Sequence, residues 1–237
     1  MTPEKLLEEL KKACPDKLRS VVLYGSAAAG DYVGKRSDYN VLVVTTELGR
    51  ETLAAFAAPT RAWLKAGNPA PLLFTEERLR QSTDVFPIEL LDIKECHRIL
   101  HGEDLVSALE IDTANLRLEI EHELRGKLIQ LRQRYIAAAG RRRATRELMA
   151  ESVGTFLVLF RAALRLFATD IPARKLEALE ELGRHIDCDL GVFRTINALK
   201  AGELDGKDMD FDQLFGEYLS AIEAVIDAVD RRLESAL

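Results

Sequence analysis

The 237-residue chain has few cysteines, the residues typical of small disulfide-bonded or zinc-binding proteins. It contains only three cysteines, Cys14, Cys96 and Cys188, which lie far apart and are odd in number. Their spacing argues against a disulfide framework and against a zinc site. Glycine and proline are also scarce, with 14 and 7 residues, so the composition excludes a fibrous or mainly disordered chain.

Long hydrophobic runs are missing as well. The longest apolar stretch, 153–160, ends at Arg161 and is shorter than the roughly 18–20 residues that a membrane span needs. The first residues, Met1-Thr2-Pro3-Glu4-Lys5, lead into a charged amphipathic segment and not into a signal peptide. We therefore expect a cytoplasmic protein with no membrane partner.

The net charge of −6 makes no strong case for nucleic-acid binding by the whole molecule. The charge is unevenly placed, however. Residues 125–146 hold eight basic residues and no acidic one, whereas 203–234 hold ten acidic residues against three basic ones. The basic run predicts either a solvated face balanced by the acidic segment or a site for an anionic partner, and we favour the solvated face.

The first part of the chain alternates between two kinds of hydrophobic pattern. A short opening helix follows Thr2-Pro3-Glu4 and ends before Pro15. A second helix is expected at 51–66, and four apolar runs predict strands at 18–24, 39–45, 70–75 and 86–93. This pattern indicates an α/β or α+β domain with at least four strands.

Beyond about residue 110 the strand signals end and helical periods take over. One long amphipathic helix begins near Leu116, and the helix at 144–168 is apolar around much of its circumference, so we expect it at the centre of a bundle. Shorter helices are expected at 173–182, ended by Gly183, and at 190–200, before a last long helix at 215–233. We place the boundary near residues 101–104, which divides the chain into 1–104 and a helical bundle at 105–237.

One stretch carries chemistry. An apolar strand ends in Gly25-Ser26, and the chain returns as a second strand that opens with Asp38-Tyr39-Asn40. Gly25 permits close backbone approach, and Ser26 adds a hydroxyl beside free N–H groups, so the pair could bind phosphate oxygens. Asp38 and Asn40 are two residues apart on a strand and face the same side. Oxygen ligands placed in this way suit Mg²⁺ together with substrate phosphates.

These residues resemble the signature of the nucleotidyltransferase superfamily that includes DNA polymerase β, the kanamycin and streptomycin nucleotidyltransferases and the minimal nucleotidyltransferases. The resemblance covers about residues 15–105 and implies an α+β fold: a small mixed-sheet nucleotidyltransferase domain followed by an all-α bundle. It also implies Mg²⁺-dependent transfer of a nucleoside monophosphate, AMP from ATP or its counterpart from another nucleoside triphosphate, to a hydroxyl of an unidentified small molecule or protein. Gly25 and Ser26 would bind the nucleotide, and Asp38 and Asn40 would bind the metal.

One position departs from the family pattern: this chain has Asn40 where the family has its second aspartate. An amide oxygen can coordinate Mg²⁺ but brings no negative charge. Three interpretations stay open: an active enzyme with a weakened second metal site, an enzyme that uses another carboxylate, and a nucleotide-binding or regulatory protein that has lost the chemistry. An interaction module whose helical half binds a partner or pairs into a homodimer is a further alternative.

The resemblance also implies a third carboxylate, a metal ligand and the base that deprotonates the acceptor. The candidates are Glu89, Asp92 and Glu95. On a regular strand, Glu89 and Asp92 would point to opposite faces, so only one of them could join Asp38. We favour Glu89, because it resembles in position a glutamate of the streptomycin-modifying relatives.

Overall fold

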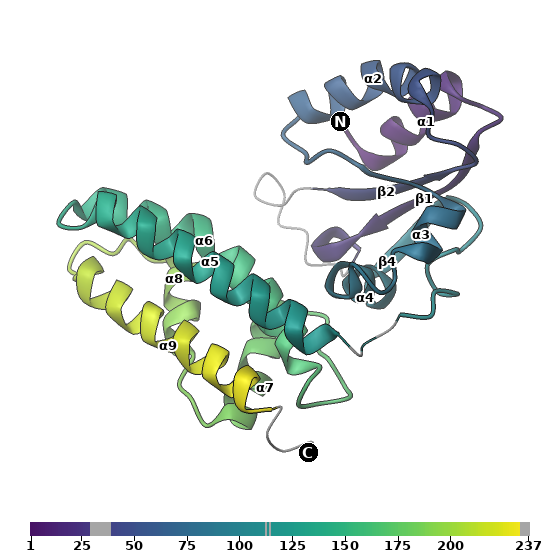
Figure 1. Cartoon of the computed structure of the whole chain (residues 1–237). Coiled ribbons are helices and arrows are strands. Elements are labelled where there is room, and N and C mark those ends of the chain that lie inside the picture. Colours follow the sequence, from purple (N-terminus) through teal and green to yellow (C-terminus); the bar gives the residue numbers. More distant parts are fainter. Residues whose placement is uncertain (29–38, 112, 114, 233–237) are drawn as a thin grey trace. The chain divides into compact units, whose positions relative to one another are not determined.

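The computed structural model describes residues 1–28, 39–111, 113 and 115–232 (Figure 1). Its internal contacts divide the chain into two compact units, Met1–Thr113 and Ala114–Leu237. The first unit thus extends past the expected boundary at residue 104. The reason is that Leu105, Val106 and Leu109 are buried in its core, so the segment after the last strand still packs on the sheet.

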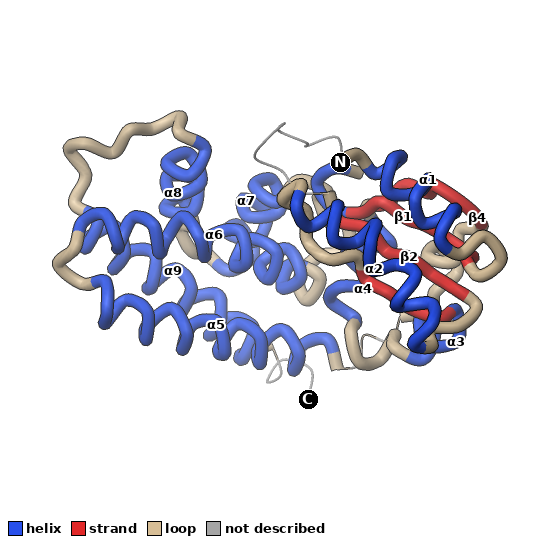
Figure 2. Tube along the Cα trace, turned by 90° about the horizontal axis from the view of Figure 1, so that it is seen from above, coloured by secondary structure: helices blue, strands red, loops and turns tan. Residues whose placement is uncertain are grey.

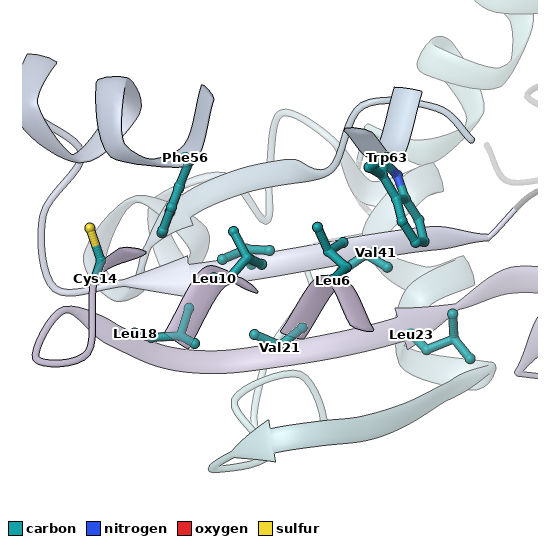
Figure 3. Packing of buried hydrophobic residues seen from close by; sticks show 10 residues of the cluster. Leu6, Leu10, Cys14, Leu18, Val21, Leu23, Val41, Phe56 and Trp63 are labelled. Atoms are coloured by element: carbon teal, nitrogen blue, oxygen red, sulfur yellow. The ribbon is translucent and has the colours of Figure 1, made fainter. Parts of the chain in front are cut away.

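The first unit opens with helix α1 (Pro3–Ala13), which has the expected start and end. The Thr2 side chain accepts a hydrogen bond from the Lys5 N–H at 3.3 Å, and Pro3 occupies the first turn, where its missing N–H costs nothing. The helix buries Leu6 and Leu10 completely. In Figure 3 both side chains lie over the sheet, beside Val21 and Val41.

Among the residues that the structure describes, the first unit forms a sheet of four strands in the order β3-β2-β1-β4. These are β1 (Leu18–Tyr24), β2 (Asn40–Thr45), β3 (Leu72–Thr75) and β4 (His97–Gly102). Strand β1 is antiparallel to both β2 and β4, whereas β2 is parallel to β3, so the sheet is mixed. The two central strands are the two with nearly continuous burial, as their apolar sequences predict.

Each face of the sheet has its own hydrophobic cluster. Helix α1 and helix α2 (Arg50–Lys65) cover one face, on which Phe56 and Trp63 pack against alternate residues of β1 and β2 (Figures 2 and 3). The other face carries the intervening residues, including Val22 and Leu42. This division follows from the alternation of side chains along a strand, and it explains why successive residues are apolar at 21–23 of β1 and 41–44 of β2.

The segment 86–93, predicted as the fourth strand, is helical instead. After α3 (Glu76–Gln81), helix α4 spans Pro87–Glu95, and the fourth strand is β4, which follows it. Pro87 stands in the first turn of α4, a position that favours a helix start. Ile88, Leu90 and Ile93 of this helix are buried, and Leu91 is half-buried. The prediction is wrong because a short apolar run of this kind fits a buried helix as well as a strand.

The described residues of the second unit form helices and the segments that connect them, with no strand. It contains α5 (Leu116–Ala138), α6 (Arg142–Leu164), α7 (Lys175–Ile186), α8 (Gly191–Ala201) and α9 (Phe211–Arg231). Helix α6 packs against each of the other four, so its apolar circumference places it at the centre, as expected. Within the described ranges, no helix has the length and apolar character that crossing a membrane would require. The α+β fold class is confirmed.

One predicted helix end is wrong. Helix α7 does not stop at Gly183 but continues to Ile186, and the left-handed residue that follows the helix is Asp187, with φ of 50°. The Asp187 N–H donates to the Gly183 carbonyl. Aspartate tolerates this conformation better than most residues, so glycine is not needed there.

Candidate functional site

The predicted nucleotide-binding turn begins where β1 ends. Gly25 has a φ of +76°, a left-handed conformation that favours glycine, and it opens the short 3₁₀ turn η1 (Gly25–Ala27). The Ala28 N–H donates to the Gly25 carbonyl at 2.9 Å and closes this turn. The backbone of Ser26 lies within η1, whereas its side chain is outside the described part of the molecule. The strand-then-turn order predicted from the sequence is therefore present.

Asn40 lies next to Gly25. Asn40 opens β2 and is paired with Tyr24 of β1, which puts it beside the residue that precedes the turn. A Cβ atom on Gly25 would stand 3.4 Å from the Asn40 Nδ2 atom. The fold thus brings together Gly25 and Asn40, two of the predicted site residues. Asp38 lies outside the described residues, so its predicted role stays a prediction.

A second element is tied to the same turn. The Gly25 N–H donates to the Cys96 carbonyl at 3.1 Å, and the Cys96 thiol donates to the Gly25 carbonyl at 3.6 Å. Cys96 is buried and caps the end of α4. These two bonds fix the carboxyl end of α4 against the turn. No local pattern in the sequence indicates this link, because the role of Cys96 depends on its contact with a residue 71 positions earlier.

Glu89 lies in the first turn of α4 and its side chain is exposed. Burial raises the pKa of Tyr24 to about 12, and the negative charge of Glu89 contributes in the same direction. The Glu89 carboxylate therefore acts on the ring at the end of β1, one residue before Gly25. Because α4 is a helix, the argument that Glu89 and Asp92 face opposite ways is wrong: residues three apart on a helix lie on the same side.

A metal at this site would have only oxygen ligands. The candidate donors are the carboxylates of Asp38 and Glu89 and the amide oxygen of Asn40, and such a set fits Mg²⁺. Within the residues that the structure describes, there is no group of three or more histidine, cysteine, aspartate or glutamate side chains that could hold a metal ion. Magnesium binding therefore remains a prediction.

The basic run of the second unit pairs with acidic residues, as the solvated-face interpretation predicts. Arg125 lies 3.4 Å from Asp230, and Arg132 forms an ion pair with Glu223; both acidic partners belong to α9. Arg142 donates instead to backbone carbonyls in 206–209. These arginines therefore have their partners within the second unit.

Comparison with solved structures supports this fold. The crystal structure of spectinomycin adenyltransferase AAD(9) from Enterococcus faecialis, with ATP and spectinomycin, is similar to this chain with a TM-score of 0.56 and 15% sequence identity. The match covers 98% of this chain and 100% of that chain. No family model matches the sequence, and no curated protein matches it. At this identity the likeness concerns the fold, which the chain shares with that adenyltransferase over nearly its whole length.

Proposed function

We propose that the protein is a nucleotidyltransferase that transfers AMP from ATP to a hydroxyl group of a small molecule. The observation that carries the proposal is the juxtaposition of Gly25 and Asn40 at the end of β1, with the charge of Glu89 acting on the neighbouring Tyr24. The likeness to an adenyltransferase whose structure holds ATP and spectinomycin supports the same chemistry.

In the proposed reaction the acceptor oxygen attacks the α-phosphorus of ATP. The new bond joins that oxygen to the α-phosphorus, the bond from the α-phosphorus to the bridging oxygen of the β-phosphate breaks, and pyrophosphate leaves with the electron pair. Glu89 accepts the proton of the attacking hydroxyl. The Gly25-Ser26 turn would supply the Ser26 N–H and hydroxyl to the phosphates, since the Gly25 N–H already donates to the Cys96 carbonyl.

Magnesium would be held by Asp38, Asn40 and Glu89, and when bound it would supply positive charge beside the phosphates. Of these three ligands, Asn40 differs from the family pattern, which has an aspartate at this position. Since the amide carries no charge, the three ligands provide two negative charges and not three. We therefore propose that this site binds Mg²⁺ more weakly than a site with three carboxylates and fills at a higher Mg²⁺ concentration. We do not propose that it has lost the metal.

The test is release of pyrophosphate from ATP with Mg²⁺ or Mn²⁺ in the presence of candidate acceptors. Spectinomycin is the first acceptor to try, because the similar structure contains it together with ATP, followed by other polyhydroxylated small molecules. An AMP adduct of the acceptor, detected by mass, together with an equal amount of pyrophosphate supports transfer. Tight ATP binding with no adduct across the acceptor panel favours the alternative, a nucleotide-binding or regulatory protein on this scaffold, for which Asn40 is the motivating residue.

A further inference from the structure

The entry to β2 is held by a residue from a different loop. The backbone N–H of Tyr39, which directly precedes Asn40, donates to the Oδ1 atom of Asn68 at 3.2 Å. Asn68 lies in the turn after α2, 29 residues further along the chain. The start of β2 is therefore fixed by a side chain as well as by its pairing with β1.

Asn68 is itself held in place from the other side. Its exposed fraction is only 8%, and its Nδ2 atom donates to the Trp63 carbonyl at 3.5 Å. The two contacts agree on the orientation of the amide, since the oxygen faces a donor and the nitrogen faces an acceptor. A buried amide with both ends bonded costs little, whereas removal of one partner leaves the other group unsatisfied.

Trp63 anchors this arrangement in the core. Its side chain is fully buried, and its indole N–H donates to the Pro69 carbonyl at 2.7 Å, which fixes the turn that carries Asn68. Its ring also contacts the Tyr39 ring, with the centroids 6.1 Å apart. In Figure 3 Trp63 projects from the ribbon of α2 onto the sheet, near Val41 of β2. One rigid aromatic residue thus holds both the turn and the strand entry.

We propose that Asn68 is a positioning residue of the candidate site: it fixes the backbone of Tyr39 and so holds Asn40 against Gly25. It touches neither nucleotide nor metal, and it acts through the strand that carries a predicted metal ligand. Groups that hydrogen-bond a metal ligand commonly change metal affinity by about tenfold to a hundredfold when they are removed, and Asn68 bonds the backbone of the residue that precedes the ligand. This role in the reaction rests on the function proposed above, whereas the hydrogen bond to Tyr39 does not.

The experiment compares three variants of the full chain. Asn68→Ala removes the acceptor. Asn68→Asp keeps an oxygen at Oδ1 but loses the donor to Trp63. Ser20→Ala is the matched control: Ser20 is fully buried, its hydroxyl donates to the Glu103 carbonyl at 2.8 Å, and it lies four positions before Tyr24 on β1, away from the strand end that forms the site.

Two readouts separate positioning from a loss of stability. Hydrogen exchange of the Tyr39 amide, followed by NMR, should become roughly tenfold faster or more in Asn68→Ala. It should stay near the wild-type rate in Asn68→Asp and in Ser20→Ala. The Mn²⁺ concentration that half-saturates the protein in the presence of ATP, followed by the electron spin resonance of free Mn²⁺, should rise about tenfold to a hundredfold in Asn68→Ala and stay unchanged in Ser20→Ala.

The inference is overturned if Asn68→Ala leaves the Tyr39 exchange rate unchanged, or if Ser20→Ala raises the Mn²⁺ requirement as much as Asn68→Ala does. A wild-type protein that binds no Mn²⁺ with ATP contradicts the proposed function instead. In that case the exchange data still test whether Asn68 fixes the Tyr39 backbone. Faster exchange of the Tyr39 amide in Asn68→Ala alone supports this role, and unchanged exchange refutes it.

Discussion

Gly25 and Asn40 meet at the end of β1, where a Cβ atom on Gly25 would stand 3.4 Å from the Asn40 Nδ2 atom. The two residues come from the ends of neighbouring antiparallel strands, β1 and β2. A Cβ atom at this distance would be in van der Waals contact with the amide, so the positive φ of Gly25 is the feature that favours glycine here. The proposed function depends on this relationship.

Replacement of Gly25 by alanine should weaken ATP binding. At a φ of +76° the alanine side chain costs about 1–2 kcal/mol of folding free energy, and its methyl group meets the Asn40 amide. Gly140→Ala is the matched control: Gly140 has a φ of +72°, and an added methyl group there would meet none of the described, non-neighbouring atoms within 4 Å. Both variants should lose similar stability in thermal melts, but only Gly25→Ala should lose ATP affinity in calorimetry. Equal ATP affinity in the two variants would contradict the role of Gly25.

Replacement of Asn40 by aspartate should tighten Mg²⁺ or Mn²⁺ binding when nucleotide is present, because it restores a negative charge facing the metal. Titration of each metal against wild type and variant at fixed ATP measures the change. Asn40→Ala, which removes the oxygen, should shift the affinity in the opposite direction. If the three proteins bind metal alike, Asn40 is not a ligand.

The electrostatic effect of Glu89 on Tyr24 can be tested without any assay of transfer. Burial is the larger cause of the raised Tyr24 pKa of about 12, and Glu89 adds to it. Glu89→Gln removes a negative charge that disfavours the tyrosinate, so the pKa of Tyr24 should fall but stay above the ordinary value of 10. Ultraviolet titration against a Tyr24→Phe background isolates this ring. An unchanged Tyr24 pKa in Glu89→Gln would contradict this contribution of the Glu89 charge.

The same Glu89→Gln variant should keep ATP binding and reduce transfer by about 10²–10⁴ once an acceptor is known, because proton removal by a general base contributes that much. Steady-state rates of pyrophosphate release measure the loss. A variant that retains wild-type turnover would remove Glu89 from the mechanism.

Two neighbouring arginines of α6 should differ in their effect on stability. Arg142 donates to the Gly206, Lys207 and Met209 carbonyls and lies 4.6 Å from the centroid of the Phe211 ring. Arg142→Ala should therefore lower the free energy of unfolding by about 1.5–3 kcal/mol.

Arg143 provides the comparison, since its side chain is 91% exposed and pairs with Glu147 in the same helix. Arg143→Ala should change the free energy of unfolding by less than about 0.5 kcal/mol. Urea denaturation of the two variants measures both values. Equal losses would show that the contacts of Arg142 do not hold the 206–209 loop.

The parts of the fold that the sequence predicts are those whose structure is set locally. Strand β1 and helix α1 are predicted correctly, because the apolar run at 21–24 and a proline-containing cap are local signals. Helix α4 is mistaken for a strand, and β4 is missed: its residues are exposed or half-buried, since it lies at an edge of the sheet. Its pairing with β1 depends on contacts that are distant in the sequence.

The candidate site divides in the same way. Gly25 and Asn40 belong to a motif that the sequence displays, and their proximity follows from the pairing of β1 with β2. The roles of Cys96 and Asn68 are not visible in the sequence, because each acts on this motif only after the chain has folded. A cysteine after a helix and an asparagine in a turn have many structural roles, and the pattern alone does not select this one.

The most direct test of the proposed site is calorimetric titration of the wild-type protein with ATP in the presence and absence of Mg²⁺. We predict ATP binding that depends on the metal, that is weakened in Gly25→Ala, and that is preserved in Gly140→Ala. Absence of ATP binding at millimolar ATP with Mg²⁺, or binding that Gly25→Ala leaves untouched, would contradict the assignment of this strand end as the nucleotide site.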